Sequence, residues 1–197
     1  MWPFFDPRFF DSPVKSGEQL ILDFRLLFTV IHYLAYGSNL HPLRLVVRVP
    51  SAKLVGTVTI PDRELTFHKR SVDNSGKCTF HERVGHTLHG AVFAFDPNDK
   101  LGLDQVEGLG KGYIEKLVKC SVAGNSYEAF AYVAASSHLN VTLQPYTWYK
   151  DLVLAGARYH NFPTAYVQSI EAIEDIQDPD ARRRIKNENI LATFGSI

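Results

Sequence analysis

The feature that most limits the fold is a series of short β-branched and aromatic runs that begins at Ile31 and continues to Ala134. Each run is bounded by Gly, Pro, Asn or Asp, which is typical of short strands joined by turns. The pattern predicts strands at residues 32–36, 52–60, 65–69, 87–95, 114–122 and 127–134. The chain is therefore expected to be rich in β-structure.

Between the fourth and fifth predicted strands, the sequence carries a helix signal. Asp96 can cap a helix, and Pro97 can occupy its first position because proline has no amide hydrogen to lose there. The helix is expected to run towards Gly108. Its end would pack Leu103 and Val106 while presenting Glu107.

The last third of the chain changes to a helical period. Pro145 and Pro163 each look like a first helical residue, and the apolar residues after them repeat at helical spacing, which predicts two amphipathic helices. Three arginines at residues 182–184 are interpreted as a solvated helix face. The chain is thus an α+β protein with one domain over residues 31–197. Residues 1–30, crowded with Phe and Pro, form an N-terminal arm or extension, packed on the domain or on a second subunit.

Composition narrows the classes of partner. The chain has 197 residues, and its 21 Lys and Arg balance its 21 Asp and Glu, so the positive field of a nucleic-acid binder is missing and a small-molecule partner fits better. No uncharged apolar run has the length of a membrane span, and the apolar stretch at residues 20–35 is interrupted by charged residues, which argues against a cleavable signal peptide. Two cysteines, Cys78 and Cys120, predict free thiols in a reducing cytoplasm.

Two segments could carry chemistry. Residues 33–40 read Tyr-Leu-Ala-Tyr-Gly-Ser-Asn-Leu, an apolar strand that ends in a turn of small residues at Gly37. Such a turn can expose successive amide hydrogens to an anion, although an ordinary turn is the simpler interpretation, and glycine permits backbone angles closed to other residues. The second segment places Glu107 before a glycine-rich loop and Tyr113. A carboxylate among apolar neighbours becomes a stronger base, whereas a solvated helix-end glutamate would have no special role. The loop lacks the spacing of phosphate-binding and dinucleotide-binding motifs.

Other groupings of reactive residues are weaker. Cys78, His81, His86 and His89 are possible metal ligands, but their spacing matches no common zinc pattern and strand alternation would separate them. No metal site is therefore expected. Ser38 lacks the Gly-x-Ser-x-Gly pattern of a hydrolase nucleophile, and neither cysteine has a recognisable catalytic context.

Taken together, the Tyr-Gly-Ser-Asn-Leu turn after a strand and the later Glu-Gly before a glycine and a tyrosine resemble the gamma-glutamylcyclotransferase family. The resemblance extends from about residue 31 to residue 176 and includes the Pro-Ser-Ala at residues 50–52, the Gly-Ala-Val-Phe at residues 90–93 and the segment 145–149. It implies a small mixed β-barrel flanked by helices. It also implies that the turn and the carboxylate face one cavity.

The resemblance further implies a role for each matching residue. Glu107 would be the catalytic carboxylate. The substrate would be bound by Tyr36, Gly37, Ser38 and Asn39 of the turn, and by Tyr113, Tyr132 and Tyr149. The turn reads Gly-Ser-Asn rather than the Gly-Ser-Leu of the glutathione-specific branch, which speaks against glutathione itself as the substrate, although glutathione metabolism remains the expected setting.

The implied reaction cyclises a gamma-glutamyl group to 5-oxoproline and releases the attached amino acid or amine. The substrate carries its own nucleophile, so the enzyme, a lyase of the type formerly classed as an acyltransferase, needs no metal or cofactor and mainly positions the substrate and moves protons. The hypothesis requires that Glu107 shares a cavity with the Gly37 turn and is not held in a permanent ion pair. The alternative is a non-catalytic small-molecule binding protein on the same fold, and either could be a homodimer.

Overall fold

The computed structural model describes residues 30–194. The arm expected over residues 1–30 lies, except for Val30, outside the described residues, as do the arm's phenylalanines. Within the described part the strands are β1 (Ile31–Ala35), β2 (Lys53–Arg70), β3 (Gly76–Phe95), β4 (Tyr113–Val122) and β5 (Asn125–Ala134). The helices are α2 (Pro42–Arg48), α3 (Lys100–Glu107), α4 (Thr147–Tyr159), α5 (Thr164–Glu171) and α6 (Ala181–Phe194), with short 3-10 turns at Pro97–Asp99 and Ser136–His138.

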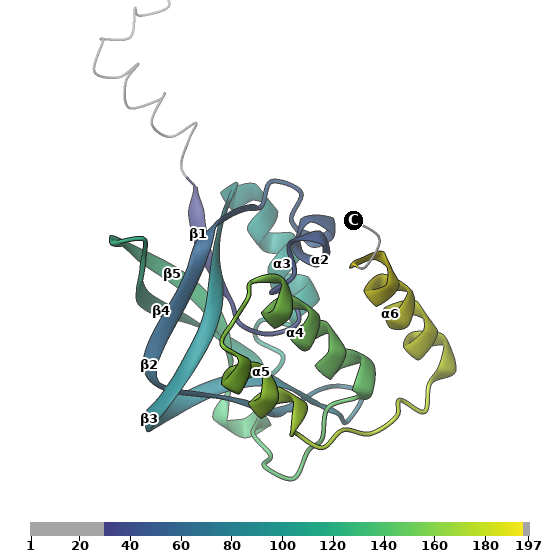
Figure 1. Cartoon of the computed structure of the whole chain (residues 1–197). Coiled ribbons are helices and arrows are strands. Elements are labelled where there is room, and N and C mark those ends of the chain that lie inside the picture. The colour runs from purple at the N-terminus through teal and green to yellow at the C-terminus, as the bar shows by residue number, and fades with distance from the viewer. Residues whose placement is uncertain (1–29, 195–197) are drawn as a thin grey trace, which may run out of the picture.

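The strands form one mixed sheet in the order β2-β3-β1-β5-β4. Two antiparallel hairpins, β2–β3 and β4–β5, flank the short β1, which runs antiparallel to β3 and parallel to β5. In Figure 1 helices α2, α4 and α6 lie on one side of the sheet, with α6 outside α4. The α+β class is therefore confirmed.

The closed barrel is not confirmed. The sheet order begins at β2 and ends at β4, and no ladder pairs these two edge strands within residues 30–194. The edges nevertheless approach each other, because a Cβ placed on Gly56 of β2 would lie 2.4 Å from a methyl carbon of Val122 on β4. The contact between the edges is thus made by side-chain packing against a glycine.

The long hairpin differs from the sequence prediction. The strands expected at residues 52–60 and 65–69 are one continuous strand, interrupted by an irregularity at Pro61 and Asp62, where Asp62 has φ 55°. The strand expected at residues 87–95 begins at Gly76 instead. Residues 76–86 are mostly polar and carry no local strand pattern. They form a strand because their backbone groups pair with β2.

The helix expected before Gly108 is confirmed: Asp96 accepts a hydrogen bond from the Asn98 amide, α3 follows, and Gly108 ends it with φ 73°. The two C-terminal helices are present but start later than expected. Pro163 precedes α5 by one residue, and Pro145 precedes α4 by two, because the Pro145 carbonyl accepts a hydrogen bond from Ile176 instead.

Helix α2 was not expected, and α6 was expected only as the solvated helix face at residues 182–184. Helix α2 follows the small-residue turn directly and begins with Pro42 after the capping side chain of His41. Helix α6 has few apolar residues, and the ring of Phe194 at its end stacks on His41 at a centroid distance of 3.8 Å. The predicted solvated face at residues 182–184 is wrong for Arg183 and Arg184, which are partly buried and bonded to Asp178.

Cys78 and Cys120 are both free thiols, as expected. In the part of the chain described here, no helix is both long and apolar enough to cross a membrane.

Candidate active site

A small cavity opens beside the turn that follows β1. Its empty volume, with the mouth included, is about 270 Å³. It is lined by Tyr33, Tyr36, Gly37, Ser38, Asn39, Cys78, Glu107, Tyr113, Tyr132 and Tyr149. The structure thus brings together all eight residues for which the sequence predicted a catalytic or binding role, from the turn after β1 and from α3, β4, β5 and α4.

The turn is fixed from two sides. Leu40 donates its amide hydrogen to the Gly37 carbonyl at 3.0 Å, which closes the turn. Helix α4 lies directly against the next residues, since a Cβ on Gly156 would lie 2.3 Å from the Leu40 Cβ. Within the described residues Ser38 makes no hydrogen bond, so its amide and hydroxyl are free to bind a ligand in the cavity.

Glycine is required at position 37 for space rather than for its backbone angles. Gly37 is not among the glycines with positive φ, which corrects the expectation from the sequence. A Cβ at this position would lie 3.0 Å from the Cys78 Cβ and 3.3 Å from its sulfur. Cys78 therefore forms the floor under the turn, and its burial raises the pKa of the thiol to about 12, so it stays neutral.

Glu107 occupies the last position of α3, where Gly108 ends the helix and leaves the carboxylate pointing into the cavity. Its Oε1 atom accepts hydrogen bonds from Asn39 Nδ2 at 2.9 Å and from Arg48 Nη1 at 2.7 Å. Arg48 also donates to Asn39 Oδ1 at 2.7 Å, so the three side chains form a closed triangle.

These contacts correct two expectations. Val106 does not pack in the core but is 55% exposed, whereas Leu103 is fully buried as expected. More importantly, Glu107 does not sit among apolar neighbours alone. It forms an ion pair with Arg48, with side-chain exposures of 17% and 21%, which is the kind of contact that the hypothesis from the sequence excludes if it is permanent. Both bonds use Oε1, and within residues 30–194 Oε2 has no hydrogen-bond partner.

Three tyrosines of the cavity are bonded to backbone groups, whereas Tyr33 and Tyr132 are bonded to side chains. Tyr36 donates its hydroxyl hydrogen to the Tyr132 carbonyl, and Tyr113 donates to the Cys78 carbonyl at 2.7 Å. The Tyr149 hydroxyl accepts from the Cys78 amide at 3.1 Å. Burial raises the pKa of Tyr36, Tyr113 and Tyr149 well above the usual value, so these phenols remain neutral hydrogen-bonding groups.

A second cavity adjoins the first and was not expected from the sequence. It shares Ser38, Glu107, Tyr113 and Tyr149 with the first cavity, which we call the inner cavity. The empty volume of the second cavity, with its mouth included, is about 480 Å³. Its remaining lining residues are Arg44, Arg48, Lys69, Ser71, Lys77 and Val106. We call it the outer cavity; four of its side chains are basic, and Glu107 is its one acid.

Part of this basic lining had a sequence signal. Arg44 and Arg48 are four positions apart after Pro42, so they share a face of any helix that starts there. Lys69 and Lys77 had no such signal, because their proximity comes from the pairing of β2 with β3, where Lys69 lies opposite Lys77.

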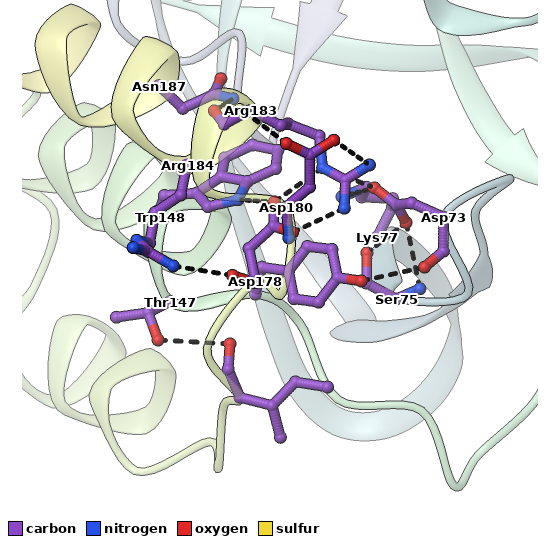
Figure 2. Close-up of polar contacts among 12 residues, drawn as sticks. Asp73, Ser75, Lys77, Thr147, Trp148, Asp178, Asp180, Arg183, Arg184 and Asn187 are labelled. Atoms are coloured by element: carbon purple, nitrogen blue, oxygen red, sulfur yellow. Dashed lines mark hydrogen bonds and ion pairs between the residues drawn. The ribbon is translucent and has the colours of Figure 1, made fainter.

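A polar network lies behind the outer cavity, and Figure 2 shows its residues. Asp73 accepts from the Ser75 hydroxyl at 2.7 Å and lies 3.4 Å from the Lys77 ammonium. Arg183 of α6 lies 4.0 Å from the same carboxylate of Asp73 and pairs at 2.6 Å with Asp178, whose side chain is fully buried. The network therefore joins the C-terminal helix to a lysine of the outer cavity.

The four candidate metal ligands lie in different surroundings. Cys78 is buried beneath Gly37, while His81 and His86 lie near Glu64 on the long hairpin. His89 packs on Tyr166 at a centroid distance of 4.6 Å. No group of three or more potential metal ligands occurs among residues 30–194.

Comparisons with known proteins show what this chain is similar to in sequence. A profile of the AIG2-like family matches residues 87–170. The human gamma-glutamylcyclotransferase is 28% identical over 149 residues, which cover 72% of this chain and 78% of the human protein. The mouse gamma-glutamylcyclotransferase is also 28% identical, and the bovine one is 27% identical, over the same shares.

Solved structures show a similarity of fold to the same kind of protein. A gamma-glutamyl cyclotransferase superposes with a TM-score of 0.74 and 25% identity, covering 84% of this chain and 99% of that one. An uncharacterized human protein superposes with a TM-score of 0.69 and 25% identity, covering 83% and 98% of the two chains.

The fold and the cavity together define a small α+β protein in which a helix-end glutamate and a turn of small residues face one pocket. The resemblance of this protein to the gamma-glutamylcyclotransferases, an enzyme family, is confirmed by both its sequence and its fold.

Proposed function

We propose that this protein cyclises the gamma-glutamyl group of gamma-glutamyl amino acids or amines to 5-oxoproline and releases the free amino acid or amine. The observation that carries the proposal is the contact between Asn39 of the turn and Glu107 of α3, which places the carboxylate and the turn at one cavity. The names of the relatives support the general activity.

The carboxylate supplies the proton transfers. Because Asn39 and Arg48 both bind Oε1, the Oε2 atom of Glu107 is the one that accepts a proton from the substrate's α-ammonium group. The amine then attacks the gamma-carbonyl carbon and closes a five-membered ring. As the bond between that carbon and the leaving nitrogen breaks, the protonated Glu107 returns the proton to the leaving amine. The carboxylate thus regenerated takes the second proton that the ring nitrogen must lose and passes it to the released amine, which departs as an ammonium ion.

The turn and the tyrosines position the substrate. The unbonded amide of Ser38 can donate to an anionic oxygen of the substrate, and a donor placed where charge develops is typically worth a few kcal/mol in acyl transfer. The neutral hydroxyls of Tyr113 and Tyr149 are anchored on Cys78, so they form a rigid wall of the cavity. Holding the amine near the carbonyl in this way converts ring closure into a positioned intramolecular step.

A second candidate function has its own observation. The ion pair of Glu107 with Arg48 is the arrangement expected if the carboxylate has a structural role, in which case the protein binds a small molecule without converting it. The two functions differ in turnover, not in the shape of the cavity.

One experiment separates the two candidates. Purified protein is incubated with a panel of gamma-glutamyl dipeptides, gamma-glutamyl amines and glutathione, and 5-oxoproline is measured by mass spectrometry. Release of 5-oxoproline from any panel member supports the enzyme. Binding by calorimetry without any release supports the non-catalytic binder and overturns the enzymatic proposal.

A further inference from the structure

The four basic side chains of the outer cavity differ in whether their charge is compensated. Arg48 is paired with Glu107 at 2.7 Å. Lys77 is paired with Asp73 at 3.4 Å, and Figure 2 shows this aspartate bonded to Ser75 within the network behind the cavity. These two cations are therefore already balanced by carboxylates of the protein.

Among residues 30–194, no carboxylate pairs with Arg44 or Lys69. Arg44 is 8% exposed, and its buried Nε atom has no hydrogen-bond partner in the described part of the chain. Lys69 is 6% exposed; its ammonium lies 4.4 Å from the centroid of the Tyr113 ring, and among the described residues no carboxylate forms an ion pair with it. Burial lowers the pKa of Arg44 to about 10 and also lowers the pKa of Lys69, as expected for cations removed from water.

Buried charges without a counterion are unfavourable, and proteins usually pair them with an opposite charge. Unpaired cations that line a cavity are therefore candidates for binding an anionic ligand. Both side chains line the cavity that shares Glu107 and Ser38 with the inner one. One substrate molecule can therefore occupy both cavities, with its glutamyl group against Glu107 and an anionic group near Arg44 and Lys69.

We propose that Arg44 and Lys69 form a second anion-binding subsite, which selects gamma-glutamyl substrates whose leaving amine is a dicarboxylic amino acid. The assignment rests on the proposed function, because it takes the inner cavity as the site of the glutamyl group. The leaving amino acid then lies in the outer cavity, where its two carboxylates meet Arg44, Lys69 and the paired Lys77. A neutral or cationic leaving amine would leave the two unpaired cations without a counterion.

The test compares two substrates of the same size. Gamma-glutamyl-glutamate and gamma-glutamyl-glutamine differ only in the charge at the end of the leaving side chain, and kcat/KM for 5-oxoproline release is measured for both. We expect the wild-type protein to prefer gamma-glutamyl-glutamate by roughly tenfold, the effect of one charge-assisted hydrogen bond. Lys69→Met keeps the length of the stem and removes the charge, so it should reduce this preference severalfold, and Lys69→Arg should restore it.

Lys119→Met is the matched control. Lys119 is exposed on β4 and does not line the outer cavity, so this variant should keep the wild-type preference. Equal kcat/KM for both substrates in the wild-type protein, or a preference that survives in Lys69→Met, would overturn the subsite while leaving the proposed reaction intact. Absence of 5-oxoproline from both substrates and from the wider panel would overturn the proposed function and the subsite with it.

Discussion

Asn39 and Glu107 are 68 residues apart in the sequence, and their side chains meet at 2.9 Å. The contact joins the turn after β1 to the end of α3, and Arg48 of α2 bonds to both partners. Three separate elements thus fix the direction of one carboxylate oxygen, and the other oxygen has no hydrogen-bond partner among residues 30–194. The following predictions test what this arrangement does.

Glu107→Gln keeps the shape of the side chain but removes the proton acceptor. If Glu107 moves the proton, kcat for 5-oxoproline release should fall by about 10²- to 10⁴-fold, the usual contribution of general acid–base catalysis. The rate is measured by mass spectrometry with the best substrate of the panel, and folding is checked by circular dichroism. Glu128→Gln, at an exposed position of β5, is the control and should keep the wild-type rate. A Glu107→Gln protein that turns over normally would contradict the mechanism.

Gly37→Ala tests whether the turn depends on its contact with Cys78. The added methyl group would lie 3.0 Å from the Cys78 Cβ, so the turn has to move, at a cost of about 1–3 kcal/mol typical of overpacking. We expect kcat/KM to fall because the Ser38 amide moves with the turn. Thermal unfolding and steady-state kinetics give the two readouts.

Gly102→Ala is the matched control for that change. Gly102 lies inside α3, and a Cβ there would meet nothing within 4 Å. Replacing a glycine by alanine inside a helix usually stabilises by up to about 1 kcal/mol, so this variant should unfold at a slightly higher temperature with unchanged activity. A Gly37→Ala protein that behaves like Gly102→Ala would show that the space at position 37 is not limiting.

The ammonium group of Lys77 should make both substrate affinity in the outer cavity and protein stability depend on pH. Burial lowers the pKa of Lys77 to about 8, and the carboxylate of Asp73 partly opposes the shift. Above this pH the folded protein loses a charge that an unfolded lysine keeps to about pH 10. Two opposite effects follow. Affinity for an anionic leaving group should fall as pH rises through about 8, whereas the contribution of Lys77 to stability should rise between about pH 8 and 10, because the unfolded state binds more protons there.

The measurement is KM for gamma-glutamyl-glutamate at intervals between about pH 7 and pH 9.5, a range set by the lysine's shifted pKa. A Lys77→Met protein should show a flatter profile. The groups that face the Lys77 ammonium are Asp73, Arg183, Cys78, Tyr146, Trp148 and Tyr149. A wild-type KM that does not change across this range would contradict the role of Lys77.

Asp178→Asn should destabilise the attachment of α6. The Asp178 carboxylate is fully buried and accepts from Trp148 at 2.8 Å and from Arg183 at 2.6 Å. Removing the charge leaves Arg183 without its closest partner, which should cost roughly 1–3 kcal/mol in the free energy of unfolding. Chemical denaturation at neutral pH measures the loss. Glu188→Gln, which breaks the exposed contact of Glu188 with Arg184, should change stability by less than about 0.5 kcal/mol.

The ion pair of Asp178 with Arg183 also predicts how the free energy of unfolding changes at low pH. The bonds from Arg183, together with those from Trp148, hold the pKa of Asp178 at about 2, below its ordinary value of 3.8. Its stabilising contribution is thus complete above about pH 4 and is lost as pH falls towards 2. The difference in unfolding free energy between the wild-type protein and Asp178→Asn should shrink over that window. A difference that is constant down to pH 2 would rule out the ionised pair.

The sequence predicted those parts of the protein that have a local signal. The helix from Asp96 to Gly108 was found because its cap, proline and terminal glycine are contiguous, and the two site segments were found because each carries its motif within a few residues. The prediction was poorer for the first part of β3, because residues 76–86 are polar and become a strand only by pairing with β2. The bounds and the buried contacts of helix α6 were not predicted, because an ion pair with the buried Asp178 helps to attach it and its apolar stripe is weak.

In the site, too, only the residues that belong to local motifs were predicted. Glu107 and Gly37 could be placed at one cavity from motifs, but the partner of the carboxylate could not, because Arg48 is brought to it by the course of the chain after the turn. The charge of the outer cavity depends on Lys69 and Lys77, which face each other only through the register of two strands. Long-range pairing of this kind leaves no trace in local spacing.

The packing of Gly37 on Cys78 also limits how this pocket can be redesigned. A library that varies position 37 alone samples only substitutions that push against a fixed floor, and one that enlarges position 78 alone lifts the turn. Variants with a wider inner pocket should therefore come from paired changes, in which volume removed beneath the turn matches volume added to it.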